Sequence, residues 1–229
     1  MFTKRLFKPA LIATAAAMSV AGLPAGAAQA KTIRHLVSID RCAPAYADRP
    51  ISAQSLNVVE LSVNCLINRG RAEAGAPPLT RPFSTDAHGG LSESTPLYNS
   101  ALAHAQQSVA AKSWDLNNGL VSHLNPGTPV PADRNQLQQL ANTQINDRIR
   151  GAGYCAGGHS WRDAENTYGG VNITPRMAAD FWLHDPDHRP NTIDPNLKEH
   201  RIAVVVGSAF PGLPDAGSAA LVEDMGACS

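Results

Sequence analysis

Four cysteines constrain how this chain can fold more than any other feature of the sequence. They are Cys42, Cys65, Cys155 and Cys228, and no two of them have C-x-x-C spacing. An even number of cysteines in an exported chain favours disulfides over thiolate metal ligands or redox chemistry. Three connectivities are possible. We favour Cys42–Cys65, which would attach an N-terminal arm to a helix, and Cys155–Cys228, which would tether the C-terminal tail.

The N-terminal segment has the three parts of a secretory signal. Three positive charges precede an apolar, Ala-rich run at residues 10–23, and Ala28-Gln29-Ala30 supplies small residues at a cleavage site. We therefore predict a signal peptide at residues 1–30 and a secreted, extracellular protein. The apolar run is shorter than the roughly 20 residues that span a bilayer. Because no later segment approaches that length, the sequence predicts no transmembrane segment.

The charge balance argues against a nucleic-acid partner. The whole chain has 19 Lys and Arg and 19 Asp and Glu residues, and the predicted signal carries three of the basic ones and none of the acidic ones. The mature chain therefore has a net charge near −3. Nucleic acids require a dense basic face, and anionic lipids require a polybasic stripe. Neither is present in the sequence.

Hydrophobic periodicity predicts an N-terminal arm followed by a domain of mixed helices and strands. The arm, at residues 31–53, contains Pro44 and Pro50 and is predicted to be extended. The predicted helices span residues 56–74, 94 or 95–113, 134–150 and 175–184, and the predicted strands span 165–171, 202–206 and 219–225. Helices and strands do not alternate as in parallel α/β folds. We therefore predict an α+β domain at residues 54–229, with a small antiparallel sheet between helical layers.

Five separated blocks of the sequence occur in the order of the motifs of one family. The blocks are Leu66-Ile67-Asn68-Arg69 with Pro78-Leu79, then Leu102-Ala103-His104-Ala105, then Ser122-His123 with Arg148 to Tyr154, then Glu165-Asn166, and finally Trp182 to Ile193. They resemble the CAP superfamily (cysteine-rich secretory, antigen five and pathogenesis-related proteins), in particular its short bacterial secreted branch. The resemblance implies a three-layer α-β-α sandwich, an extracellular location and a cleft lined by two His and two acidic residues.

The residues that the resemblance assigns to this cleft are His123, Glu165, Asp185 and His188. Such a set can bind a divalent cation such as zinc, with His123 and His188 as ligands. It can also transfer protons, or form a hydrogen-bonded network in which Glu165 orients both rings. All three roles stay open. No catalytic residue is assigned, because the sequence has no HExxH helix, G-x-S-x-G elbow or P-loop.

Four further residues are expected to support the cleft. The amides of Asn68, Asn166 and Asn191 can satisfy backbone groups where helices and strands start. Trp182 is expected to pack behind the site and to fix the end of the helix that carries Asp185.

The remaining histidines are given simpler roles. His104 is expected at the edge of the core, and His184 at a solvated helix end. Because Pro186 lies between His184 and His188, these two are not expected to form a helical ligand pair. Surface positions are expected for His35, His88, His159 and His200.

The leading functional expectation is an extracellular binding or effector module. The resemblance implies a small apolar or lipid-like ligand for some relatives. Two alternatives use the same four residues differently. One is a metal-dependent, protease-like hydrolase, and the other is a structural envelope protein in which the residues only stabilise the fold. An enzyme is the less favoured interpretation, since no nucleophile is assigned to the cleft.

Overall fold

The computed structural model describes residues 42–229, except 43, 83, 86–90, 93–94 and 159. The predicted signal at residues 1–30 and the first part of the predicted arm lie outside the described residues. Within the described part, no helix is both long and apolar enough to cross a membrane.

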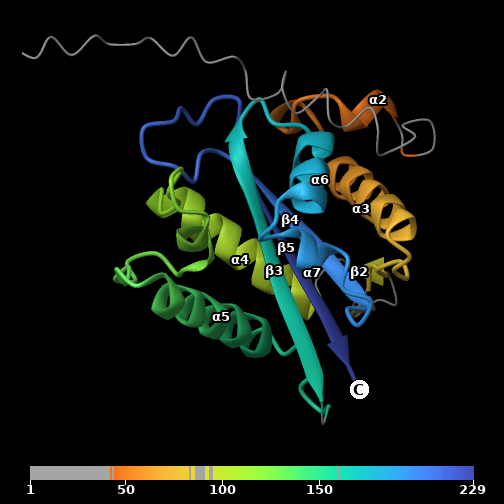
Figure 1. The fold of residues 1–229 in the computed structure, drawn as a ribbon. Coiled ribbons are helices and arrows are strands. Elements are labelled where there is room, and N and C mark those ends of the chain that lie inside the picture. Colours follow the sequence, from red (N-terminus) through yellow and green to blue (C-terminus); the bar gives the residue numbers. More distant parts are fainter. Residues whose placement is uncertain (1–41, 43, 83, 86–90, 93–94, 159) are drawn as a thin grey trace, which may run out of the picture.

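An antiparallel sheet of three strands forms the centre of the described structure (Figure 1). The strands are β3 (Trp161–Val171), β4 (Glu199–Val206) and β5 (Ser218–Cys228). β5 lies between β3 and β4. The register places Glu165 and Arg201 on either side of Asp224. Directly paired residues point to the same face of a sheet, so these three ionisable side chains share one face.

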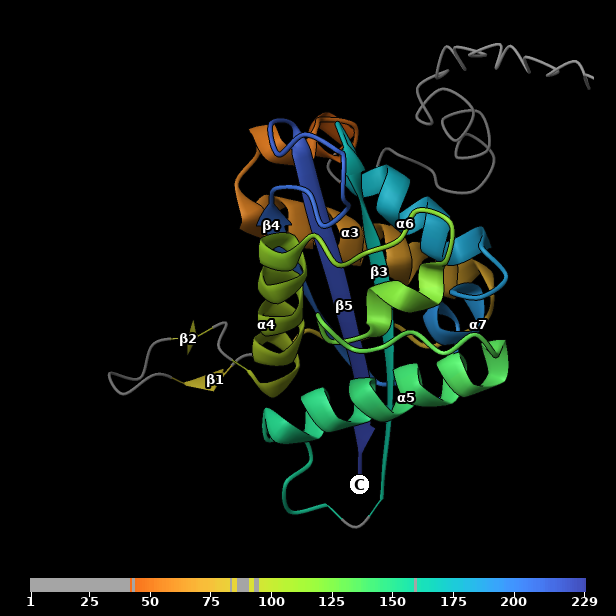
Figure 2. The same ribbon diagram turned by 90° about the vertical axis from the view of Figure 1, so that its left-hand side faces the viewer.

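Helices cover both faces of the sheet, which gives three layers (Figure 2). One outer layer contains α3 (Leu56–Glu73) and α6 (Pro175–His184), and the other contains α4 (Pro96–Ala111) and α5 (Arg134–Gly151). Side chains alternate between the faces along a strand. Accordingly, Leu221 of β5 packs with residues of α3 and α6, whereas its neighbour Val222 packs against α4. The α+β prediction with a small antiparallel sheet is confirmed.

The four predicted helices and three predicted strands are all present, with small shifts of their ends. The end points of α6 agree with the prediction for local reasons. Thr174 Oγ1 accepts a hydrogen bond from the backbone N–H of Met177, and Pro175 occupies the first helical position. The helix ends before Pro186, which disfavours helical geometry at Asp185. In α3, the N-cap residue Ser55 makes no side-chain capping hydrogen bond.

The prediction of an extended arm is wrong for its described part. This segment contains α2 (Pro44–Ala47) and the 3-10 helix η2 (Ile51–Ala53). Ile51 is fully buried, and its N–H donates to the carbonyl of Ile173 at 2.8 Å. Packing against a distant part of the chain therefore decides the local structure here.

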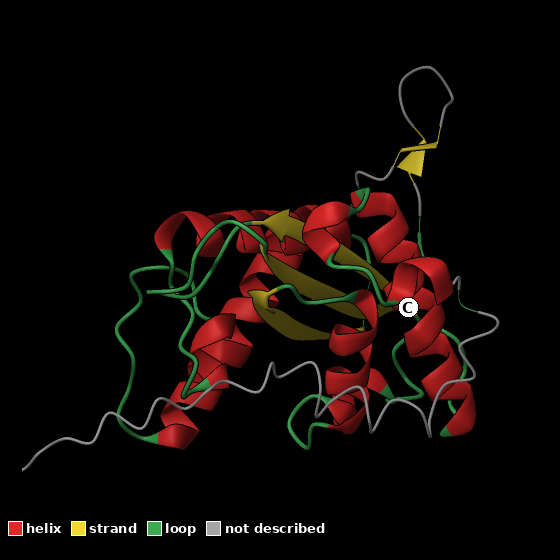
Figure 3. Cartoon of the chain, turned by 90° about the horizontal axis from the view of Figure 1, so that it is seen from above, coloured by secondary structure: helices red, strands yellow, loops and turns green. Residues whose placement is uncertain are grey.

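Other connections also contain short elements that periodicity did not indicate. The segment after α3 has a small hairpin of β1 (Ser84–Thr85) and β2 (Leu91–Ser92), which projects from the rest of the molecule (Figure 3). The segment between α4 and α5 contains the 3-10 helix η3 (Gly119–His123). A short helix, α7 (Arg189–Thr192), follows α6.

Both disulfides have the predicted pairing. Cys42–Cys65 joins the start of the described chain to α3, and Cys155–Cys228 joins the segment before β3 to the end of β5. The pairing prediction is confirmed.

Candidate functional site

The four residues of the predicted cleft come from four segments and lie close together. His123 ends η3, Glu165 belongs to β3, Asp185 caps α6, and His188 precedes α7. A pocket of about 290 Å³ is lined by His123, Glu165 and His188. Asp185 does not line this pocket but contacts His188.

Each of the two histidines is held by a carboxylate through Nδ1. His123 Nδ1 lies 2.8 Å from Glu165 Oε1, and His188 Nδ1 lies 2.7 Å from Asp185 Oδ1. The two ring centroids are 6.2 Å apart. A carboxylate at Nδ1 places the hydrogen on that nitrogen and leaves Nε2 with a free lone pair when the ring is neutral. Both rings are therefore oriented for a ligand that binds through Nε2.

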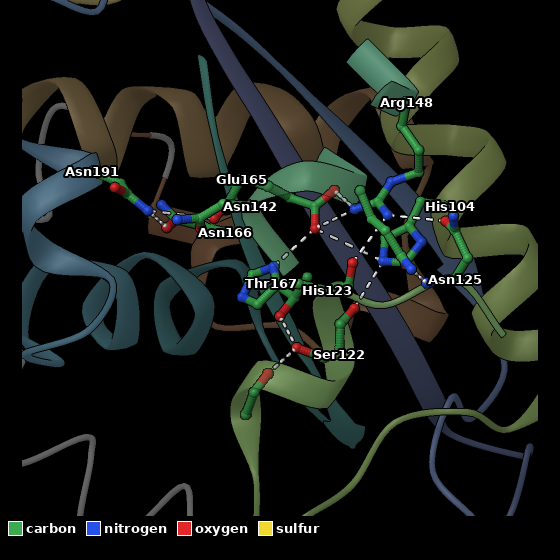
Figure 4. Close-up of polar contacts among 12 residues, drawn as sticks. His104, Ser122, His123, Asn125, Asn142, Arg148, Glu165, Asn166, Thr167 and Asn191 are labelled. Atoms are coloured by element: carbon green, nitrogen blue, oxygen red, sulfur yellow. Dashed lines mark hydrogen bonds and ion pairs between the residues drawn. The ribbon is translucent and has the colours of Figure 1, made fainter. Parts of the chain in front are cut away.

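Arg148 of α5 is the main partner of Glu165 (Figure 4). Its Nη2 donates to both carboxylate oxygens, at 2.9 and 2.7 Å. Its Nη1 donates to the carbonyl of His123 and to Asn125 Oδ1, both at 3.0 Å. Arg148 therefore fixes both the carboxylate and the segment that carries the first histidine. Sequence reasoning included Arg148 in a family block but gave it no role.

Ionisation in this network follows from burial and charge. Burial alone would raise the pKa of Glu165, but Arg148, His104 and His123 together hold that pKa well below its ordinary value. Burial lowers the pKa of His188, although the hydrogen bond from its ring to Asp185 opposes this effect. Glu165 is therefore ionised and the His188 ring neutral at pH 7, because the ordinary pKa of His is about 6.5.

A second buried carboxyl group lies beside Glu165 and was missed by sequence reasoning. Asp224 is directly paired with Glu165 across the sheet and is fully buried. Burial and the charge of Glu165 raise the pKa of Asp224 well above its ordinary value. Asp224 is therefore neutral while Glu165 is charged, as expected for two carboxyl groups that share one site.

Three of the four predicted supporting residues lie next to the cleft. Asn191 Nδ2 is 3.4 Å from the carbonyl of Glu165, and Asn166 Nδ2 donates to Glu223 Oε2 at 2.9 Å. Trp182 is fully buried, and its indole N–H donates to a β3 carbonyl. Asn68 instead bonds both the N–H and the carbonyl of Leu79, in the segment after α3.

Two histidines differ from their predicted positions. His200 was predicted at the surface, but it is fully buried between Glu223 Oε1 and Asn64 Oδ1, each at 2.6 Å. The prediction was wrong because β5 and α3 supply polar partners that allow a histidine to be buried. His104 is also fully buried, with Nε2 3.8 Å from Glu165 Oε1, rather than at the edge of the core.

His184 keeps a side-chain exposure of 30%, in agreement with a partly solvated helix end. The predictions for His35, His88 and His159 concern residues outside the described part of the chain.

The pocket lining is polar. Five carboxamide side chains contribute to it, those of Asn117, Asn118, Gln138, Asn142 and Asn191. An exposed ion pair, Arg134 with Asp187 at 3.3 Å, joins two lining residues from different segments. Leu120 and Ile145 are the aliphatic residues of the described lining, which contains no Ser, Thr, Cys or Lys. The pocket therefore offers many hydrogen-bonding groups and no covalent nucleophile of these types.

Comparisons of the chain with protein-family models, curated proteins and solved structures found no match. The chemistry of the site is therefore inferred from its own geometry. Among the described residues, no group of three or more His, Cys, Asp or Glu side chains is placed to hold a metal ion. The cleft thus offers two oriented imidazole nitrogens, with water or a bound molecule left to complete the coordination of any cation.

Proposed function

We propose that this chain is a secreted binding module of the CAP type, whose cleft holds a divalent cation between His123 and His188. Zinc suits a pair of imidazole nitrogens best. The carboxylate at each Nδ1 is the observation that carries the proposal, because metal-binding histidines commonly donate their other ring N–H to such a group. The signal-like N-terminus and the two disulfides support secretion.

The separation of the rings is compatible with a shared ion. A zinc ion bound to an imidazole nitrogen at about 2.0 to 2.1 Å lies about 3.2 Å from the ring centre. At the tetrahedral angle two such rings have centroids about 5.2 Å apart, and about 6.4 Å only when the two nitrogens face each other across the ion. The centroids of His123 and His188 are 6.2 Å apart, so a tetrahedral ion requires the rings to approach each other by about 1 Å. In this proposal Glu165 and Asp185 orient the rings and are not themselves ligands.

The lining favours a polar ligand over the apolar or lipid-like ligand that the family resemblance implies. Carboxamides, an ion pair and two imidazoles outnumber the aliphatic side chains of the described lining. A polar ligand could complete the coordination of the ion and bond the surrounding amides. Binding, rather than hydrolysis, is the function that these groups support without a further catalytic residue.

Zinc titration of the purified protein by calorimetry, without its predicted signal and at pH 7.5, tests the proposal. We expect one ion per chain, and a loss of affinity of at least about tenfold in His123→Ala and in His188→Ala, since each removes one of two protein ligands. His184→Ala is the matched control, because His184 bonds Asp180 and does not line the cleft. Absence of stoichiometric zinc, or binding that survives both cleft substitutions, would overturn the proposal.

A further inference from the structure

One helix supplies a long wall to the cleft that contains His123 and His188. The cleft residues of α5 have the spacing i, i+4, i+8 and i+11, which places them on a single face of the helix. At a rise of about 1.5 Å per residue, this wall is about 16 Å long. Its N-terminal end lies beside Asp187, in the connection between α6 and α7 (Figure 2). The residues of the wall are Arg134, Gln138, Asn142 and Ile145.

The carboxamides of this wall keep hydrogen-bonding atoms that the protein does not use. Gln138 and Asn142 are both exposed, and Gln138 Nε2 donates to Asn142 Oδ1 at 2.9 Å. This bond leaves Gln138 Oε1 as an acceptor and Asn142 Nδ2 as a donor, and neither atom has a partner among the described residues. Because both side chains are exposed, a ligand in the cleft can reach them.

Two further segments supply carboxamides to the cleft. Asn117 and Asn118 precede η3, and Asn191 belongs to α7. A carboxamide presents an acceptor and a donor side by side, so it can bond two neighbouring groups of a ligand. Hydroxyl groups match this arrangement, because each can both donate and accept. The lining therefore fits a ligand that carries closely spaced hydroxyls.

The charged side chains of the lining are already paired within the protein. Arg134 pairs with Asp187 at 3.3 Å, and Glu165 pairs with Arg148 at 2.7 Å. The described lining therefore has no lysine or unpaired arginine for the phosphate groups of a nucleic acid or a phospholipid. An uncharged ligand leaves both ion pairs in place and brings no charge that must be desolvated in the cleft.

The cleft lacks the features that commonly recognise peptides. An extended peptide pairs with the backbone of a sheet edge, and an amphipathic helix binds in an apolar groove. This cleft presents side-chain amides instead, and its two aliphatic residues, Leu120 and Ile145, are each only 8% exposed. The described lining also has no Phe, Tyr or Trp, so a sugar ring would be bound by its hydroxyl edge and not stacked by its face. These groups favour a sugar chain over a peptide.

We propose that the cleft binds an uncharged oligosaccharide, whose hydroxyls bond the carboxamides of α5 and of the two other segments. This inference rests on the binding function proposed above for the cleft, but the carboxamides can act with or without the cation. Because the wall of α5 is longer than one sugar ring, a chain of several sugars should bind more tightly than a monosaccharide. Hydroxyl oxygens near the two imidazoles are suited to complete the coordination of a bound ion.

Cellotetraose, chitotetraose and mannotetraose are the neutral probes, and their monosaccharides are the controls for length. Tetragalacturonate is the charged sugar chain, and acetylated, amidated tetra-alanine is the peptide. Each is titrated into the protein without its predicted signal, once with zinc and once with a chelator. The Kd is obtained from the ¹⁵N shifts of the Asn and Gln side-chain amides. We expect at least one neutral tetrasaccharide to shift the signals of Gln138 and Asn142, and to bind more tightly than its monosaccharide, the charged chain and the peptide.

Substitutions on α5 test whether the carboxamides make the contacts. Gln138→Ala and Asn142→Ala should each weaken binding of that tetrasaccharide about fivefold, as expected for the loss of one hydrogen bond. Neither should change the affinity for zinc. Gln139→Ala is the matched control, because Gln139 is an exposed glutamine of the same helix that does not line the cleft. This control should leave the Kd unchanged.

The two proposals for the cleft can fail separately. No binding by any neutral tetrasaccharide, equally tight binding of the charged chain or the peptide, or equal effects of Gln138→Ala and Gln139→Ala would each overturn the oligosaccharide proposal. If zinc still binds in that case, the cation site stands alone. A tetrasaccharide that binds with the expected effects to a chain that takes up no zinc would overturn the cation site and support the oligosaccharide proposal.

Discussion

Glu165 bonds both the guanidinium of Arg148 and the ring of His123 from a fully enclosed position, with a side-chain exposure of 0%. Removal of one partner of a buried ion pair costs about 3 to 5 kcal/mol, because the other charge is left unpaired. We expect Glu165→Ala to lower the free energy of unfolding by about 3 kcal/mol or more, measured by urea denaturation at pH 7.

An exposed glutamate provides the control for this measurement. Glu73 lies 3.6 Å from Arg69 in an i, i+4 pair on α3, and both side chains are partly solvated. Such pairs contribute about 0.5 kcal/mol or less, so Glu73→Ala should change stability little. Equal losses in the two variants would contradict the network described for Glu165.

Asp224 is expected to make the folded protein less stable as the pH rises from about 4 to 7. Its pKa is raised in the folded state, whereas in the unfolded chain it titrates near its ordinary value of about 3.9. As the pH rises above about 4, the unfolded chain therefore loses this proton first, which lowers the free energy of unfolding. Asp224→Asn keeps a similar shape but does not titrate.

We therefore expect the stability of Asp224→Asn relative to wild type to increase between pH 4 and pH 7. Urea denaturation of both proteins at several pH values measures this difference directly, and the contribution of Glu165 is common to the two. A difference that stays constant or falls with pH would show that Asp224 is ionised in the folded protein.

At the scale of the elements, the ends of a helix or strand can be predicted when the residues that fix them lie nearby in the sequence. The limits of α6 followed from Thr174, Pro175 and Pro186, which lie within or beside the helix. β3, in contrast, begins at Trp161 rather than at the predicted 165, because its first residues pair with the end of β5, where Trp161 faces Cys228. A short sequence window cannot show that pairing.

The site could be predicted only in part for the same reason. His123 and His188 have no local pattern that joins them, and the family resemblance alone singled them out. Arg148 lies on a polar helix, so its role becomes visible only when α5 packs beside η3 and β3. Asp224 did carry a signal, because it stands with Glu223 inside an otherwise apolar strand.

His200 shows that strand periodicity contained more information than the prediction used. Residues that alternate along a strand share a face, so His200 belongs with Ile202 and Val204, which are both buried in the main core. The same alternation applied across the whole of β4 predicts a buried histidine. Its partners, Glu223 and Asn64, come from β5 and α3 and could not be identified from spacing alone.

At the scale of the whole molecule, the two disulfides constrain the chain by different amounts. Cys42–Cys65 closes a loop over a sequence separation of 23 residues, and Cys155–Cys228 closes one of 73. Since a cross-link restricts the unfolded chain more when its loop is longer, the chain-entropy model assigns about 3 kcal/mol to the first and about 4 kcal/mol to the second.

We therefore expect the double substitution Cys155→Ala with Cys228→Ala to lower the free energy of unfolding by about 1 kcal/mol more than Cys42→Ala with Cys65→Ala. Urea denaturation of the two variants, each with its other disulfide intact, measures the difference. The longer loop also includes all of β3 and β4 and most of β5, so its closure limits how far the strands can separate in the unfolded chain. A larger loss from the Cys42 and Cys65 variant would mean that folded-state packing of the arm on α3, and not loop closure, dominates the contribution of that disulfide.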